Sequence, residues 1–376
     1  MSEILGIRDQ ASLKEWLEDQ PREVAVWIAS RAAARVLPIW WEAVLSEDWA
    51  NEANLTVLPA LRRLLTSSVA FNKPSDSLKI AAKTTLEGGI VGIPFKPALE
   101  ADGAARRAAL AASAAPFAHN AALAVFTASR AHGEAQIGLR TDAEFVTRGE
   151  YLEALPLWPE GQGPLAERWR AIKWEVDNSE GAEDWRFWIE WYDTLLAGRP
   201  MLGDTARTWE MLELIALIDP ETWDKGPEEV NPVIRGIWEL HRLRAEVAAL
   251  QAEKEAFLAV QASAAHRGHN QPPEGLVDDA SAVAQQITII WVGLDEAGEE
   301  LDQVAPDKGV LRAIAERMFS ALNEVVAYCG KVGDKVIMAG AATIGTTGGA
   351  VLIDHFAING RLYQFVKNLL SFGIGG

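Results

Sequence analysis

The stretch DWRFWIEWYDTLLAG, residues 184–198, decides the fold class. It places Trp185, Trp188, Tyr192 and Leu195 at positions i, i+3, i+7 and i+10, which share one face of an α-helix. Two interpretations of this aromatic face stay open. It can be a groove for a peptide or a ring-shaped ligand, or it can be a stripe that packs into the core.

Helical periodicity continues outward from this block. Residues 23–36 (EVAVWIASRAAARV) are rich in alanine and repeat apolar residues at helical intervals. Residues 286–292 (QITIIWV) have the composition of a strand, but an isolated strand cannot build a sheet, so we expect a buried helix there. The sequence therefore predicts an all-α, multi-helical fold: an N-terminal helical body, a Pro/Gly linker and a C-terminal helical region with an apolar tail.

Several residues indicate where helices begin or stop. Ser12 with Glu15 has the spacing of a capping box. Asp219-Pro220 and Asn231-Pro232 each place a capping side chain before a proline, the arrangement of a helix start. Pro116 is expected to interrupt the alanine-rich segment 101–131.

Helix-breaking stretches divide the chain into predicted domains. EGQGP at residues 160–164 and HRGHNQPPEG at residues 266–275 are the main interruptions. The predicted parts are an N-terminal Ala-rich domain (1–159), a Trp-rich domain that ends in a heptad-like helix (160–265), a linker (266–275), and a C-terminal helical domain (276–376) whose apolar and amphipathic tail covers residues 336–372.

The overall charge excludes one class of partner. The chain of 376 residues has a formal net charge of −18 and a pI of about 4.8, so a nucleic-acid backbone would meet a repulsive field. Only the tail is slightly basic. The single cysteine, Cys329, cannot form an intrachain disulfide, and the N-terminus lacks the pattern of a secretory signal. We expect a cytoplasmic protein; if its tail reaches the inner membrane, the protein is peripheral to it or C-terminally inserted.

The tail contains an uncharged run, VIMAGAATIGTTGGAVLI, from Val336 to Ile353. A helix of that length spans about 27 Å, just short of the roughly 30 Å of a bilayer core. Gly345 and Gly349 form the G-x-x-x-G pattern of close helix contact in lipid. The following segment, residues 361–372, is amphipathic. The predicted membrane or oligomer contacts are Gly345, Gly349, Ile353, Leu362, Phe365 and Leu369. The alternative is a buried helical hairpin in a soluble domain.

A heptad-like pattern precedes the linker. Leu240, Leu243, Val247, Leu250 and Phe257 fall on a and d positions. They indicate either a coiled coil that joins protomers or a helix packed within its own domain. The predicted contacts with a protein partner are Trp185, Trp188, Tyr192, Leu243 and Leu250.

No catalytic signature was found. The sequence lacks a P-loop, a G-x-S-x-G elbow and an H-E-x-x-H zinc motif. His266 and His269 match no strong metal pattern and lie among helix breakers. We therefore predict no catalytic, cofactor-binding or metal-binding residue, and no cofactor. A non-enzymatic protein is favoured over an enzyme.

A resemblance adds to this interpretation. The aromatic block (DWxFWxxWY), the segments EVAVWIASRAAARVLPIW (23–40) and ETWDKGPEEVN (221–231), and the linker GHNQPPE (268–274) resemble recurring segments of uncharacterised bacterial helical proteins. The resemblance covers residues 16–274. It implies a helical protein and supplies neither a function nor site residues.

Two hypotheses follow. The first is a non-enzymatic helical protein with a membrane-associating, pore- or effector-like C-terminal segment that acts alone or as an oligomer, on anionic membranes. The second is a soluble helical scaffold that binds a protein partner through the Trp-rich face and the heptad helix. Self-association is compatible with the first hypothesis and expected under the second, and binding to nucleic acid is expected under neither.

Overall fold

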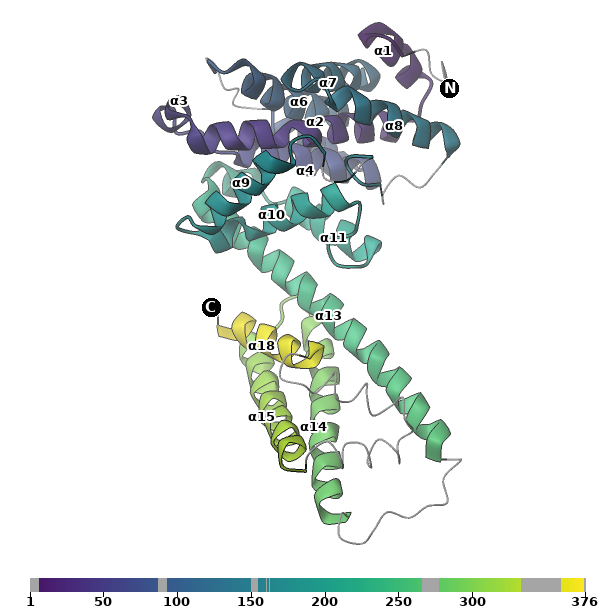
Figure 1. The fold of residues 1–376 in the computed structure, drawn as a ribbon, viewed down its shortest axis with the longest axis vertical. Coiled ribbons are helices and arrows are strands. Elements are labelled where there is room, and N and C mark those ends of the chain that lie inside the picture. Colours follow the sequence, from purple (N-terminus) through teal and green to yellow (C-terminus); the bar gives the residue numbers. More distant parts are fainter. Residues whose placement is uncertain are drawn as a thin grey trace. The chain divides into compact units, whose positions relative to one another are not determined.

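The computed structural model describes residues 7–86, 93–149, 155–159, 161, 163–265, 277–332 and 360–374. Within these ranges every regular element is an α-helix, so the predicted all-α, multi-helical class is confirmed (Figure 1). The chain forms two compact units, residues 1–238 and residues 239–376. No helix in the described ranges is both long enough and apolar enough to cross a membrane.

The first unit is built around one buried helix. Its helices are α1 (Gln10–Glu18), α2 (Arg22–Ser46), α3 (Asp48–Glu52), α4 (Leu58–Asn72), α5 (Asp76–Thr84), α6 (Lys96–Ser113), α7 (Phe117–Ala131), α8 (Ala135–Arg148), α9 (Ala166–Asp177), α10 (Ala182–Ala197), α11 (Thr205–Ala216), α12 (Pro220–Asp224) and the beginning of α13 (Pro227–Ala265). Helix α2 packs against α4, α6, α7, α8 and α9. It is therefore apolar on most of its circumference, as expected of a central helix.

Alanine lets the neighbours of α2 come close. Helices α6 and α7 pack against each other and against α2, and most of the side chains they bury are alanines. A small side chain keeps the helix backbones near one another without opening cavities. The predicted interruption at Pro116 is confirmed, since α6 ends at Ser113 and Pro116 is the N-cap of α7.

The predicted helix starts have mixed outcomes. Asp219 caps α12 and Pro220 is its first residue, as expected. The first helix begins earlier than predicted, because Asp9 is its N-cap and exchanges hydrogen bonds with Ser12. The start at Asn231 is wrong. Asn231 lies inside α13, where its side-chain oxygen accepts a hydrogen bond from Trp188 Nε1 at 2.9 Å, so it serves tertiary packing.

The second unit contains the rest of α13 together with α14 (Val277–Leu301), α15 (Lys308–Val332) and α18 (Arg361–Ile374). Residues 286–292 lie within α14, as predicted. Helices α14 and α15 approach closely where Met318 covers Gly293. Helix α18 runs antiparallel to α15: the Tyr363 and Phe319 rings are 5.6 Å apart, and Gly373 lies against Lys308 and Arg312.

The predicted domain limits differ from these units. The core of the first unit runs from Leu13 to Trp238 and includes side chains from both sides of the predicted boundary at residues 159 and 160. Tyr192, for example, donates a hydrogen bond to the carbonyl of Ala34 at 3.0 Å. The change from one unit to the other falls inside α13. The linker 266–275 lies outside the described residues.

Candidate functional site

Two arginines interrupt the apolar surface of α2. Arg31 and Arg35 are four residues apart, so they share one face of the helix. The side chain of Arg35 is only 1% exposed and that of Arg31 is 12% exposed. Charged side chains are almost never buried this far without a partner. The surroundings of these two side chains are therefore the most distinctive polar feature of the first unit.

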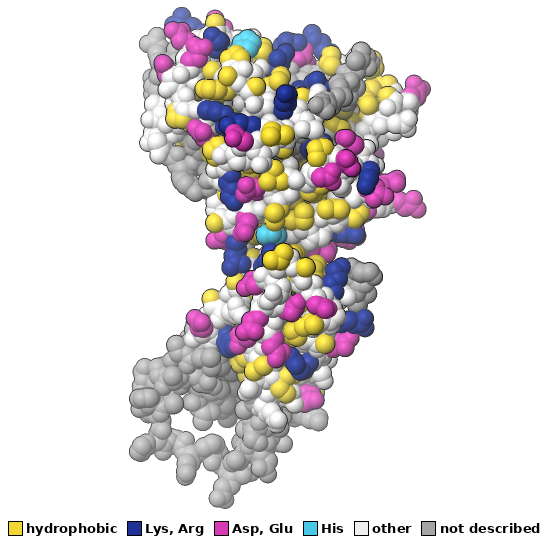
Figure 2. Space-filling view, turned by 180° about the vertical axis from the view of Figure 1, so that it is seen from behind, with side chains coloured by type: hydrophobic (Ala, Val, Ile, Leu, Met, Phe, Trp, Pro, Cys, Tyr) yellow, Lys and Arg dark blue, Asp and Glu magenta, His cyan; other side chains and the backbone are white. Residues whose placement is uncertain are grey.

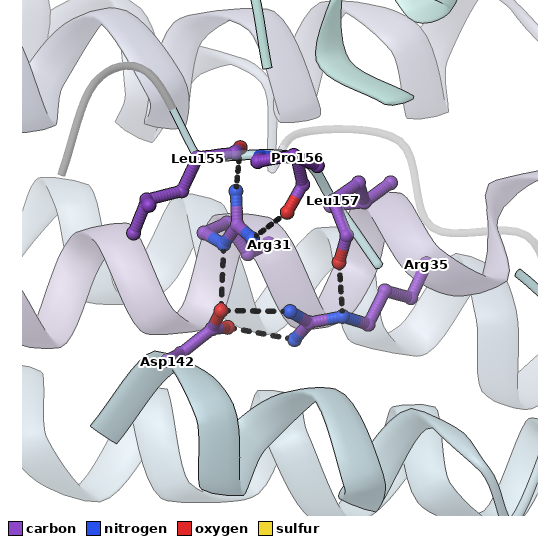
Figure 3. Close-up of polar contacts among 6 residues, drawn as sticks. All are labelled: Arg31, Arg35, Asp142, Leu155, Pro156 and Leu157. Carbon is purple, nitrogen blue, oxygen red and sulfur yellow. Dashed lines mark hydrogen bonds and ion pairs between the residues drawn. The ribbon is translucent and has the colours of Figure 1, made fainter. Parts of the chain in front are cut away.

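Both arginines converge on one carboxylate from α8 (Figure 3). Asp142 Oδ1 accepts hydrogen bonds from Arg31 Nε at 3.0 Å and from Arg35 Nη2 at 2.8 Å. Its other oxygen, Oδ2, lies 2.7 Å from Arg35 Nη1. Arg35 thus holds Asp142 through one charge-assisted hydrogen bond and one close ion contact, a stronger pairing than a hydrogen bond between neutral groups. These contacts fasten α8 to the central helix.

The remaining donors hold a non-helical segment between α8 and α9. Arg31 donates to the carbonyls of Leu155 and Pro156 at 2.9 and 2.5 Å, and Arg35 donates to that of Leu157 at 2.9 Å. Figure 3 shows the three carbonyls on the opposite side of the guanidinium groups from Asp142. Backbone carbonyls in a loop have no helix to satisfy them, so the arginines supply the missing donors.

Two glycines make room for this arrangement. A methyl group at Gly138 of α8 would lie 2.2 Å from Arg35 Nε. Gly198 ends α10 with a φ of 63°. A Cβ added there would lie 2.3 Å from the backbone nitrogen of Pro156. A Cβ at either position therefore collides with the polar cluster or with the segment that the cluster holds.

The cluster carries more positive than negative charge. Two guanidinium groups face one carboxylate, a net charge of +1. Burial lowers the pKa of Arg31 to about 10, Asp142 opposes that shift, and the neighbouring charge of Arg35 adds to it. Arg31 therefore remains charged at neutral pH. The hydroxyl of Tyr192 remains protonated, because burial raises its pKa above the ordinary value.

A cavity of about 90 Å³ borders this cluster. Arg31 forms part of its wall, with its guanidinium carbon 4.7 Å from the centre of the Trp27 ring. The wall is otherwise mostly apolar and comes from α2, α4, α10 and α11, from Leu155, and from residues 198–201 between α10 and α11. Its larger side chains are Trp27, Phe71, Trp191, Met201, Trp209 and Leu212.

The polar groups of the cavity suit binding better than catalysis. Its charged wall residues are Arg31 and Arg199, and no Asp, Glu, His or Cys is among the described residues that line it. The hydroxyls of Ser68 and Thr194 donate to backbone carbonyls of their own helices at 2.9 and 2.7 Å. An activated nucleophile needs an adjacent base, and these described residues supply none.

The predicted aromatic groove is largely core. Trp188 and Tyr192 are fully buried, and Trp185 is half-buried with its ring 6.1 Å from that of Trp41. Leu243 and Leu250 lie buried in the core of the second unit. Apart from Trp185, which keeps part of its surface, these side chains pack against other helices of the same chain, and their role as partner contacts stays a prediction.

The predicted membrane contacts fall into two groups. Leu362, Phe365 and Leu369 are buried in the second unit, against α13, α14 and α15. An amphipathic helix buries its apolar stripe wherever a complementary face exists, and the role of these three residues in membrane or oligomer contact stays a prediction. Gly345, Gly349 and Ile353 lie outside the described residues.

The cluster itself was missed at the level of sequence. One signal was present: two arginines four residues apart within an otherwise apolar helical segment. Asp142 carried no comparable signal, because it lies far away along the chain. No group of metal-binding side chains occurs among the described residues.

Searches among protein-family models, curated proteins and solved structures found no match to this chain. The resemblance to uncharacterised bacterial helical proteins stays a prediction.

Proposed function

We propose that this is a non-enzymatic helical protein whose second unit associates with the surface of an anionic membrane. The observation that carries the proposal is the uncharged run Val336–Ile353, which is inserted between two helices of one packed unit. Soluble helical domains seldom contain so long a run without a charge. Leu362, Phe365 and Leu369 take no part in the proposed contact, since they are used in the core.

The neighbouring helices limit how the run can meet a bilayer. Helix α15 ends at Val332, α18 begins at Arg361, and the two helices pack against each other. Both ends of the intervening segment therefore stay on the same side of a membrane. Two crossings would need about 17 residues each, more than residues 333–360 can provide. This favours shallow, peripheral contact over a spanning helix.

Charge supports contact with anionic lipid. Lys335, Arg361 and Lys367 oppose one carboxylate, Asp354, so residues 335–376 carry a net charge of +2. Lys367 and Arg361, which pairs with Glu253, lie on the exposed side of α18. Each cation near an anionic surface contributes about 1 kcal/mol. In lipid, Gly345 and Gly349 offer a face for self-association, which would give an oligomeric form.

Flotation with vesicles of phosphatidylcholine and phosphatidylglycerol tests the proposal. The Ile344→Asp variant places a charge inside the run and leaves α18 in its core. We expect the wild type to float with the vesicles and this variant to stay in the dense fraction. Val310→Asp is the matched control, because it adds the same charge at an exposed position of α15. Equal flotation of both variants, or none by the wild type, would reject the proposal.

The alternative, a soluble scaffold, retains one supporting observation. Trp174 on α9 is 70% exposed, and exposed tryptophans are enriched at the centres of protein interfaces. On the face drawn in Figure 2, acidic and basic side chains are interspersed with small hydrophobic areas over the described surface. If Trp174 joins two copies of the chain, sedimentation velocity will show an oligomer that Trp174→Ala dissociates. An unchanged mass would remove this alternative.

A further inference from the structure

We propose that the cavity in the first unit, bordered by Arg31 and Arg199, binds a small aromatic carboxylate. The ring would lie among Trp27, Phe71 and Trp209, and the carboxylate would meet the two guanidinium groups. This site is independent of the proposed membrane contact, which belongs to the other unit.

The charge of the ligand follows from the buried cluster. Arg31 and Arg35 share a single counterion, Asp142, so one positive charge stays uncompensated beside the cavity. Arg31 uses one N–H on each of its three nitrogens for Asp142 and the carbonyls of Leu155 and Pro156. A guanidinium carries five N–H groups, so two remain available. A buried charge favours a partner of opposite sign.

A second cation stands at the cavity. Arg199, just after the end of α10, lines the cavity and has an exposed side chain. No ion pair of Arg199 is found with any residue in the described ranges, and no carboxylate of those ranges lines the wall. The chain as a whole has a net charge of −18 and repels anions. A cavity lined by two arginines and by no acidic side chain of the described ranges has the opposite local charge, so anions bind there in preference to the rest of the surface.

The aromatic part follows from the wall. Indole and phenyl rings prefer offset or edge-to-face contact with another ring. A dry apolar cavity of about 150 Å³ is known to admit benzene. The present cavity is smaller, at about 90 Å³, and is not fully enclosed, since Arg199 and the half-buried Thr205 and Trp209 border it. A single six-membered ring with its carboxylate directed towards Arg199 fits this shape better than a larger ligand.

Calorimetric titration of the full chain with three probes tests both parts of the proposal. Benzoate carries ring and charge, benzamide carries the ring alone, and acetate carries the charge alone. We expect benzoate to bind at least about tenfold more tightly than either, a difference typical of one charge-assisted contact. Benzamide or acetate binding as tightly as benzoate, or no benzoate binding at about 10 mM, would overturn the proposal.

Variants locate the site. Arg199→Gln removes the exposed cation without disturbing the core and is expected to weaken benzoate binding about tenfold. Arg140→Gln, the same change at an exposed position of α8, should bind like the wild type.

Thr205→Trp fills the cavity from a half-buried position and should abolish binding, while an unchanged thermal midpoint shows that the fold is intact. Equal affinities of the two arginine variants would show that Arg199 plays no part and refute the site. Flotation is expected to be unaffected throughout.

Discussion

Replacing Asp142 by Asn tests whether the buried cluster holds the first unit together. The substitution keeps the shape of the side chain and removes its charge. Arg31 and Arg35 then lose their shared counterion while they remain buried. An amide oxygen in the place of Oδ1 can still accept hydrogen bonds from both guanidinium groups, but the amide nitrogen in the place of Oδ2 faces Arg35 Nη1 as a second donor. The variant therefore leaves two positive charges close together with no carboxylate between them.

The expected cost is about 3–5 kcal/mol in the free energy of unfolding, the range for removing one partner of a buried ion pair. That is a large share of the roughly 5–15 kcal/mol that a domain possesses. Urea unfolding followed by tryptophan fluorescence measures it, because Trp291 is the only one of the 15 tryptophans in the second unit. The fluorescence signal is thus dominated by the first unit.

A control on the same helix separates this effect from a general loss of negative charge. Glu144 of α8 is 45% exposed and pairs with Arg148, one turn away. Glu144→Gln should change the free energy of unfolding by no more than about 0.5 kcal/mol. If Asp142→Asn costs less than about 1 kcal/mol, or no more than the control, the cluster is not what fastens α8 and the segment 155–157 to α2.

Three further predictions concern single positions. Gly138→Ala should destabilise the first unit by about 1–3 kcal/mol in urea unfolding, since the new methyl group collides with the guanidinium of Arg35; an unchanged midpoint would contradict this. Phe365→Ala should cost the second unit about 3–5 kcal/mol and speed amide exchange in α14 and α18, and protection equal to the wild type would refute it. Hydrogen bonding by a threonine hydroxyl of its own turn lowers the pKa of Asp219 below its ordinary 3.8, so its stabilising effect is present above that value and lost as pH falls through the folded pKa. The unfolding midpoint of the wild type should therefore fall more steeply on acidification than that of Asp219→Asn, and parallel curves would exclude the effect.

Periodicity in the sequence predicted the local structure well. The repeats in residues 184–198 and 23–36 lie in α10 and α2, and the strand-like residues 286–292 lie in α14. Helix starts were less predictable. Asn231 followed by proline has the pattern of a cap, yet its side chain bonds to Trp188 from another helix. A local pattern cannot report a partner 43 residues away, so tertiary contacts decided this position.

The candidate site was largely invisible in the sequence. The sequence shows that Arg31 and Arg35 lie in an otherwise apolar helical segment. Their counterion, Asp142, lies 107 residues after Arg35, and no sequence pattern connects the two. Carbonyl groups carry no sequence signal at all, so the contacts with residues 155–157 were beyond prediction. The cavity depends on how four helices meet, and pairwise helix packing is not written in the periodicity of any one of them.

An apolar stripe on a helix predicts that this face is buried, but it does not identify the surface that covers it. In the second unit, α13 and α18 both carry apolar stripes that predict self-association or membrane contact. Both stripes are instead buried in one core that also contains side chains of α14 and α15. Once Leu243, Leu250, Leu362 and Phe365 are used in this way, the unit no longer needs a partner to hide them.

The uncharged run 336–353 differs, because its glycines and threonines give it no stripe to match to a protein face. A helix of that composition costs about 1 kcal/mol per glycine relative to alanine in water, and close helix contact in lipid is where small residues gain most. Membrane association therefore depends on the composition of this run and not on the apolar stripes of the helices that flank it. Ile344→Asp is the decisive substitution for this reason, since it changes the run and leaves every stripe of the core intact.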